Sequence, residues 1–146
     1  MPLHLLKLCV GPASIEELEA RIAANRAESL RLGQAPGPIH TTRMFPKRAR
    51  EIAEGGSIYW VIKGTLICRQ SIRAIDPVTG SDGIGRCRLT LNQEVRPVSP
   101  RPCRPFQGWR YLQARDAPAD LDRQTLGDLA EMPETLRREL AALGLV

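Results

Sequence analysis

The sequence of 146 residues lacks any apolar run approaching the roughly 20 residues that a membrane-spanning helix needs. Its start has no basic segment ahead of an apolar one, and Lys7 interrupts the first apolar residues, so no secretory signal is predicted. The composition, with 42% hydrophobic and 25% charged residues, is typical of a soluble globular protein. We therefore expect a cytoplasmic protein without a membrane partner, folded as one domain over residues 1–146.

Closely spaced metal ligands are also missing. The four cysteines stand far apart and none forms a C-x-x-C pair. A zinc site would have to gather its ligands from distant segments, so we predict neither a metal nor a cofactor. A disulfide framework is not expected in a reducing compartment, and each cysteine is interpreted as a small buried hydrophobic residue.

The known catalytic signatures are absent as well. The chain has no P-loop, no G-x-G-x-x-G after a strand, no H-E-x-x-H and no G-x-S-x-G. The glycine-rich residues 80–85 precede a predicted strand instead of a helix, so we interpret them as a turn. With only two histidines, a nucleophile pair of Cys9 with His40 is left open, because no third group that would orient it is visible.

Positive charge, by contrast, is concentrated in residues 40–111. Thirteen Lys and Arg stand there against five acids, which gives a net charge of +8, and both tryptophans and both tyrosines lie in the same stretch. Residues 1–39 have no net charge, and residues 112–146 carry −3. A basic centre with interleaved aromatic residues favours a surface for a polyanion or an anionic ligand.

Hydrophobic patterning predicts six strands and at least three helices. Strands are expected at residues 3–10, 39–43, 57–63, 66–75, 86–91 and 106–112, and helices at 15–32, 46–54 and from 132 onward. The β-branched runs 57–63 and 66–75, joined by Gly64-Thr65, give the strongest signal and predict a central hairpin. Residues 76–85 are expected to be a turn.

Local signals complete the prediction of the fold. Ser14 and Glu17 form a capping box ahead of a helical stripe made by Ile15, Leu18, Ile22 and Leu30. Four prolines in residues 95–105 predict an extended loop or a sheet edge. The fold class is therefore α+β: a mixed, mostly antiparallel curled sheet or small barrel with flanking helices, and an acidic helical tail from about residue 116.

Residues 41–48 form the first candidate site. They combine two hydroxyls, the cations Arg43, Lys47 and Arg48, and a predicted helix start, an arrangement that suits an anion. The alternative is a solvated face with Arg–Glu pairs along the helix.

The aromatic residues form the second candidate site. Strand alternation puts Tyr59 and Trp60 on opposite faces, and Trp109 and Tyr111 on one face, so half of them are expected in the core and half on a platform for base stacking. Arg110 would alternate away from Trp109, and we therefore predict a bulge at Gly108 that turns Arg110 toward a basic cleft.

Five segments carry a family resemblance: residues 1–11, 42–48, 56–64, 68–72 and 104–112. Together they resemble a bacterial family of proteins of unknown function, the domain of unknown function 1489 family, over Met1 to about Leu121. The resemblance implies kinship and leaves the activity open.

A second resemblance is to the PUA and ASCH group of small β-barrels. It rests on a short strand ending in Arg43, then a basic helix, Gly55-Gly56 and the hairpin of residues 59–75. It implies a cleft beside the hairpin that receives RNA or a modified nucleobase. ASCH domains often end this strand with Glu-x-Arg where this chain has Thr42-Arg43, so the resemblance supports the fold more than a hydrolytic activity.

These observations lead to the hypothesis of a PUA-like domain that binds RNA or a nucleotide, modified or unmodified, through a basic, aromatic-lined cleft. The predicted lining residues are Arg43, Lys47, Arg48, Lys63, Arg69, Gln70, Gln107, Trp109 and Arg110. Arginine would bind phosphate, glutamine a base edge and tryptophan a base face. One alternative is a small enzyme acting on an anionic or modified-nucleoside substrate, with Lys47 or Lys63 as base beside Thr41 or Thr42. The other is an interaction module whose basic face docks an acidic protein.

Overall fold

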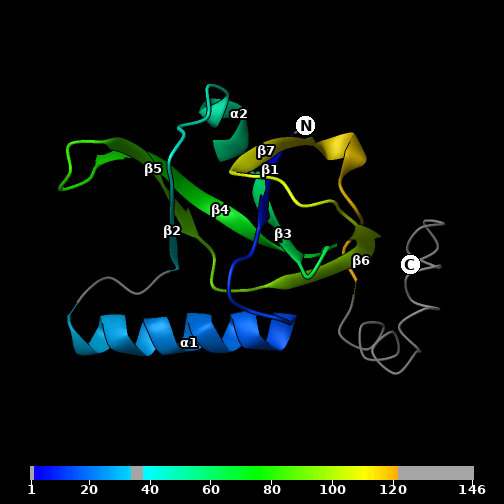
Figure 1. Ribbon diagram of the computed structural model, residues 1–146, viewed down its shortest axis with the longest axis horizontal. Coiled ribbons are helices and arrows are strands. Elements are labelled where there is room, and N and C mark those ends of the chain that lie inside the picture. The colour runs from blue at the N-terminus through cyan, green and yellow to red at the C-terminus, as the bar shows by residue number, and fades with distance from the viewer. Residues whose placement is uncertain (1, 34–37, 122–146) are drawn as a thin grey trace.

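The fold is known from a computed structural model that describes residues 2–33 and 38–121 (Figure 1). Its elements are β1 (Leu3–Leu8), α1 (Ile15–Arg31), β2 (Ile39–Thr42), α2 (Ala49–Ala53), β3 (Ser57–Ile62), β4 (Thr65–Thr79), β5 (Gly85–Leu91), β6 (Arg96–Pro102), β7 (Trp109–Gln113) and the 3-10 turn η1 (Ala114–Asp116). The predicted α+β class is confirmed. No helix in the described part of the chain is long and apolar enough to cross a membrane.

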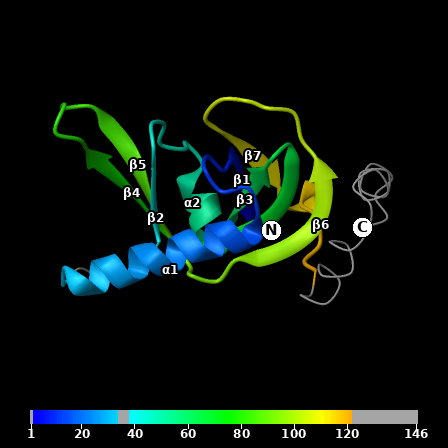
Figure 2. The same ribbon diagram turned by 60° about the horizontal axis from the view of Figure 1, so that its bottom comes forward.

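The seven strands form one mixed sheet in the order β2-β5-β4-β3-β1-β7, and β6 pairs with β4. Among the strand pairs of the described residues only β1 with β3 is parallel, so the predicted mostly antiparallel sheet is confirmed. The sheet is curled and stays open, as Figure 2 shows. Of the two predicted forms, a curled sheet or a small barrel, the structure therefore has the curled sheet.

The long strand β4 causes the curl, because its two halves belong to different neighbours. Its first half lies between β3 and β6, whereas its second half pairs with β5. The pairing shifts register between Trp60 and Val61 on β3, and between Ile72 and Ala74 on β4. Such irregularities bend a strand and increase its twist. Three prolines lie in β6, which confirms the predicted extended edge.

Strand β3 is buried on both faces of the sheet. Trp60 and its alternate neighbours belong to the larger core cluster, under the helices, whereas Tyr59 and Val61 pack with Leu66 and Val98 on the other face. The predicted central hairpin and the opposite faces of Tyr59 and Trp60 are therefore confirmed. Burial on both faces explains why residues 58–62 are all apolar or aromatic, with no alternation of polar residues.

The boundaries of two turns differ from the prediction. Lys63 and Gly64 form the β3–β4 turn with φ of 50° and 78°, and this pair of positive values is typical of a type I′ hairpin. Strand β4 continues to Thr79, because residues 76–79 pair with β5, so the predicted turn at 76–85 is wrong in its first half. The glycine-rich turn follows at residues 80–84, where the Gly80 N–H donates to Ile84 O.

Helix α1 begins where the capping box predicts. The Glu17 N–H donates to Ser14 Oγ over 3.1 Å, and Gly33 follows the helix with φ of 71°. Only Ile15 and Leu18 of this helix are buried. Leu30 is 55% exposed, so the predicted apolar stripe is wrong at its far end, where α1 extends beyond the closely packed part of the sheet (Figures 1 and 2).

Two further predictions concern helices. Helix α2 is shorter than the predicted 46–54, since it covers only Ala49–Ala53. The predicted acidic helical tail lies almost wholly in residues 122–146, outside the described residues. Before it, residues 119–121 hydrogen-bond to β6 through Ser99 and Pro97.

Candidate functional site

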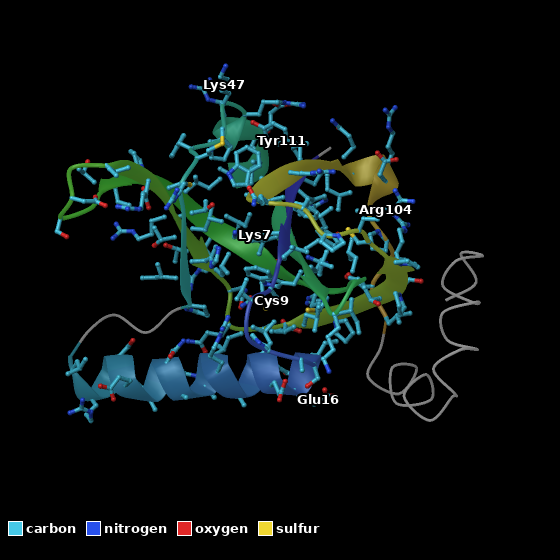
Figure 3. All side chains as sticks on the ribbon, viewed as in Figure 1. Lys7, Cys9, Glu16, Lys47, Arg104 and Tyr111 are labelled. Carbon is cyan, nitrogen blue, oxygen red and sulfur yellow. The ribbon has the colours of Figure 1, made fainter. Side chains whose placement is uncertain are left out.

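One corner of the molecule brings together four of the predicted binding residues: Arg43, Lys47, Arg48 and Trp109. Trp109 of β7 donates its indole N–H to Met44 O over 2.9 Å, which ties residues 43–48 to β7. Tyr111 OH accepts a hydrogen bond from the Arg48 backbone N–H over 3.2 Å, and the Arg48 guanidinium lies 5.6 Å from the Tyr111 ring centre. We call Arg43, Lys47, Arg48 and Arg50 the basic corner; Figure 3 shows Lys47 and Tyr111 there.

The cations of the basic corner differ in their availability. Arg48 forms an ion pair with Glu51, whereas Arg43, Lys47 and Arg50 are exposed and make no ion pair within the described ranges. The neighbouring helix α2 has only five residues, and Tyr111 already occupies the Arg48 N–H at its start. An anion at this corner would therefore have to be bound by the side chains.

Arg110 is not brought to the basic corner, and Gln107 is exposed on the segment that precedes β7. Strand β7 pairs with β1 without a register shift, so the predicted bulge at Gly108 is wrong. Gly108, with φ of 71°, precedes the strand and lets the chain turn into it. Trp109 and Tyr111 share one face, with ring centres 4.9 Å apart, as predicted. Arg110 faces the other way and lies 4.7 Å from the Phe106 ring centre.

Arg69 is placed on the opposite face of the sheet from Gln70 and is already paired. Its guanidinium donates to both carboxylate oxygens of Asp120 over 2.7 Å and to Ser57 Oγ over 2.7 Å. The pair raises the pKa of Arg69 and lowers that of Asp120. Arg69 therefore fastens the segment after η1 to the sheet.

We expect Arg69→Met to lower the free energy of unfolding by about 1–2 kcal/mol, because charge-assisted hydrogen bonds are lost from a partly exposed pair. Urea denaturation measures this change. Arg73→Met is the matched control, since Arg73 is exposed and makes no ion pair within the described ranges. Equal unfolding midpoints for the two variants would show that the Asp120 pair contributes nothing.

Lys63 lies far from the hydroxyls that were proposed to work with it. Thr41 of β2 pairs with Arg88, which pairs with Asp76 of β4. From Asp76 the strand runs back to the hairpin turn over a contour of roughly 35 Å, at about 3.3 Å per residue. The alternative enzyme with Lys63 as base and Thr41 as neighbour therefore lacks the required proximity.

Gln70 lies at a different place, in the floor of a cavity of about 230 Å³ between α1 and the sheet. Its side-chain oxygen accepts the Trp60 indole N–H over 2.9 Å, and its amide donates to Asn92 O over 2.8 Å. The helix wall consists of Leu18, Arg21, Ile22, Asn25, Arg26 and Ser29. The opposite wall and floor consist of Pro38, Ile39, His40, Trp60, Gln70 and Leu91.

The cavity is positively charged. Arg21 and Arg26 line it, and none of the described residues around it is acidic. Arg21 donates to Val10 O over 3.0 Å, which holds its guanidinium at the cavity wall. Arg26 makes no ion pair with any other described residue. An anionic group at this mouth would meet two cations without competition from a carboxylate.

His40 supplies a neutral polar group to the same cavity. Its ring stands edge-on to Trp60, with ring centres 5.2 Å apart. Its Nε2 is buried and has no hydrogen-bond partner in the described structure. Burial, assisted by the positive charges of Lys7 and Arg21, lowers the pKa of His40 to about 4. The ring is therefore neutral at pH 7 and borders the cavity as an uncharged aromatic group.

Burial disfavours the thiolate form of Cys9, Cys68 and Cys87. Burial raises the pKa of Cys68 to about 12 and that of Cys87 to about 11. The pKa of Cys9 is also raised by burial, so the open possibility of a reactive Cys9–His40 pair gains no support. Cys68 and Cys87 are buried in the core as predicted, whereas Cys9 and Cys103 are only partly buried.

Sequence reasoning missed the arginines of the cavity because residues 1–39 have no net charge. A signal was present in helix α1. Leu18 and Ile22 begin a stripe that continues at helical spacing with Asn25 and Ser29, so its second half is polar where packing against a core would require apolar residues. Arg21 lies three residues beyond Leu18 and borders the same stripe.

One family model, described as protein of unknown function (DUF1489), matches residues 5–146. Neither the curated proteins nor the solved structures contain a match to the chain. The family match covers essentially the whole sequence and agrees with the resemblance carried by its five segments. The chain belongs to the DUF1489 family.

Proposed function

We propose that the protein binds an anionic, nucleotide-like ligand in the cavity between α1 and the sheet. The base would lie toward His40 and Trp60, and the phosphate would face Arg21 and Arg26. The observation that carries this proposal is an open cavity that two arginines line, with no acid among its described lining residues.

The size of the cavity limits the ligand. Sites for small molecules commonly measure about 300–1,000 Å³, and this cavity of about 230 Å³ lies just below that range. It suits a single ring-sized group with its phosphate near the mouth. A duplex does not fit.

The chemistry of the lining residues matches the parts of a nucleotide. Arginine binds phosphate with a planar fork of donors. Asn25 and Ser29 present further polar groups, and the apolar walls of Leu18, Ile22 and Leu91 suit the faces of a base. The likeness to PUA and ASCH domains supports the same ligand class, as an analogy between folds.

Binding of each nucleoside 5′-monophosphate is measured by isothermal titration calorimetry. We expect Arg26→Gln to weaken binding about tenfold, the size of roughly one charge-assisted hydrogen bond. Arg88→Gln removes the same charge from an exposed position on the face opposite Cys87 and Leu89, and serves as the matched control. Absence of binding to all four nucleotides, or equal losses in the two variants, would refute the proposal.

A further inference from the structure

We propose that the ligand is the end of a single-stranded RNA, whose following nucleotides run from the cavity to the basic corner. This inference rests on the proposed function, because it seats the terminal nucleotide in the same cavity. It adds a second binding surface and a substrate class.

Residues of three neighbouring strands lead out of the cavity on one face of the sheet. His40 contacts Trp60 of β3, Trp60 is in register with Lys7 of β1, and Lys7 is in register with Trp109 of β7. Partners in register point to the same face. Since neighbouring strands are about 4.8 Å apart, the backbones of Trp60 and Trp109 are separated by about 10 Å, with Lys7 between them.

Lys7 is suited to hold a phosphate on this route. It is half-buried and makes no ion pair with any residue of the described ranges. Its charge reaches His40, since it contributes to the lowered pKa of that ring. In Figure 3 Lys7 lies, in projection, between α1 and the corner that holds Lys47 and Tyr111.

The route ends at the basic corner. Trp109 contacts Tyr111 and donates to Met44 O, and Arg48 stacks over Tyr111. From Ile39 at the cavity to Arg43 the extended chain covers roughly 13 Å, at about 3.3 Å per residue. A ligand that touches both places is therefore longer than the group that the cavity holds.

The basic corner also exposes apolar surface. Met44 is 70% exposed and Phe45 is 43% exposed, between the cations Arg43 and Lys47. Aromatic faces beside cations bind single-stranded nucleic acids, because any base can stack on them and the phosphates are neutralised nearby. An acidic protein would match the charge, but it would not place a ring-sized group in the cavity.

The test compares a fluorescein-labelled RNA hexamer of random sequence with the four nucleoside monophosphates. We expect the hexamer to bind at least tenfold tighter than the best mononucleotide. Its affinity should fall with salt with a log–log slope of about −2, since each of about three phosphate contacts contributes about −0.7 on a single strand. The double variant Arg43→Gln/Lys47→Gln should weaken hexamer binding about tenfold and leave mononucleotide binding unchanged.

Arg73→Gln/Arg88→Gln removes two exposed charges elsewhere and should change neither affinity. A hexamer that binds no tighter than a mononucleotide overturns the inference and leaves the proposed function standing. Hexamer binding that does not respond to Arg26→Gln also overturns it, because the RNA then avoids the cavity. If neither ligand binds, both proposals fall.

Discussion

Gly56→Ala is expected to lower the free energy of unfolding by about 3 kcal/mol, at the upper end of ordinary overpacking costs. A Cβ at Gly56 would lie 2.3 Å from Leu3 O and 2.6 Å from Ile52 O. Both atoms are backbone, so no side-chain rotation relieves the clash. The Gly56 N–H also donates to Ile52 O over 2.7 Å, and movement of α2 away from β1 would disturb this bond.

Urea denaturation followed by circular dichroism measures the effect. Gly85→Ala is the matched control, because Gly85 has no heavy atom within 4 Å of an added Cβ and no positive φ. Its unfolding free energy should stay within about 0.5 kcal/mol of wild type, as for most surface substitutions. Equal midpoints for the two variants would contradict the close approach of β1, α2 and β3 at Gly56.

The parts of the fold that were predicted correctly are those with strong local signals. The capping box at Ser14 and the β-branched runs on either side of Gly64 determine their elements within a few residues. The end of β4 could not be predicted in the same way. Residues 76–79 include Pro77 and look like a turn, yet pairing with β5 holds them in a strand. Tertiary pairing overrides weak local preference there.

The candidate site was predictable only in part for a related reason. Charge density predicts that residues 40–111 are basic, but it does not tell which cations are neutralised by the fold. Arg69 meets Asp120 from 51 residues away, whereas Arg43 and Lys47 stay exposed. Arg26 reaches the cavity from a segment without net charge. Whether a cation is free to bind a ligand depends on its ion pairs with residues distant in the sequence, and a single sequence does not reveal those pairs.

The buried state of His40 leads to the second large effect, on stability at acidic pH. The ring has a pKa of about 4 in the folded protein, against an ordinary value of 6.5. Its neutral form is therefore favoured by folding, so this contribution is fully present above pH 6.5 and is lost as the pH falls toward 4. Between pH 7 and pH 5 we expect the free energy of unfolding to drop by about 2 kcal/mol from His40.

Urea denaturation at the two pH values tests this expectation in wild type and in His40→Gln, which cannot take up the proton. His4→Gln is the control, because burial and Arg69 also lower the pKa of His4, and that ring contributes with the same sign. The paired carboxylates, whose pKa values are lowered, lose their contribution mainly below this window. His40→Gln should remove most of the difference in the free energy of unfolding between pH 7 and pH 5. His4→Gln should keep the larger part of that difference.

The pKa of His40, measured by NMR, also tests whether its ring beside the cavity is shielded from water. If NMR gives His40 a pKa near 6.5, the ring is solvated and its Nε2 is bonded to water. If its pKa is near 4, the ring is shielded from solvent and stays neutral at pH 7 beside the cavity. A bound nucleotide with its phosphate on Arg21 and Arg26 would then raise the pKa of His40, because the added negative charge offsets that of the arginines. We expect that upward shift on nucleotide addition in wild type and a smaller one in Arg26→Gln, where less nucleotide binds.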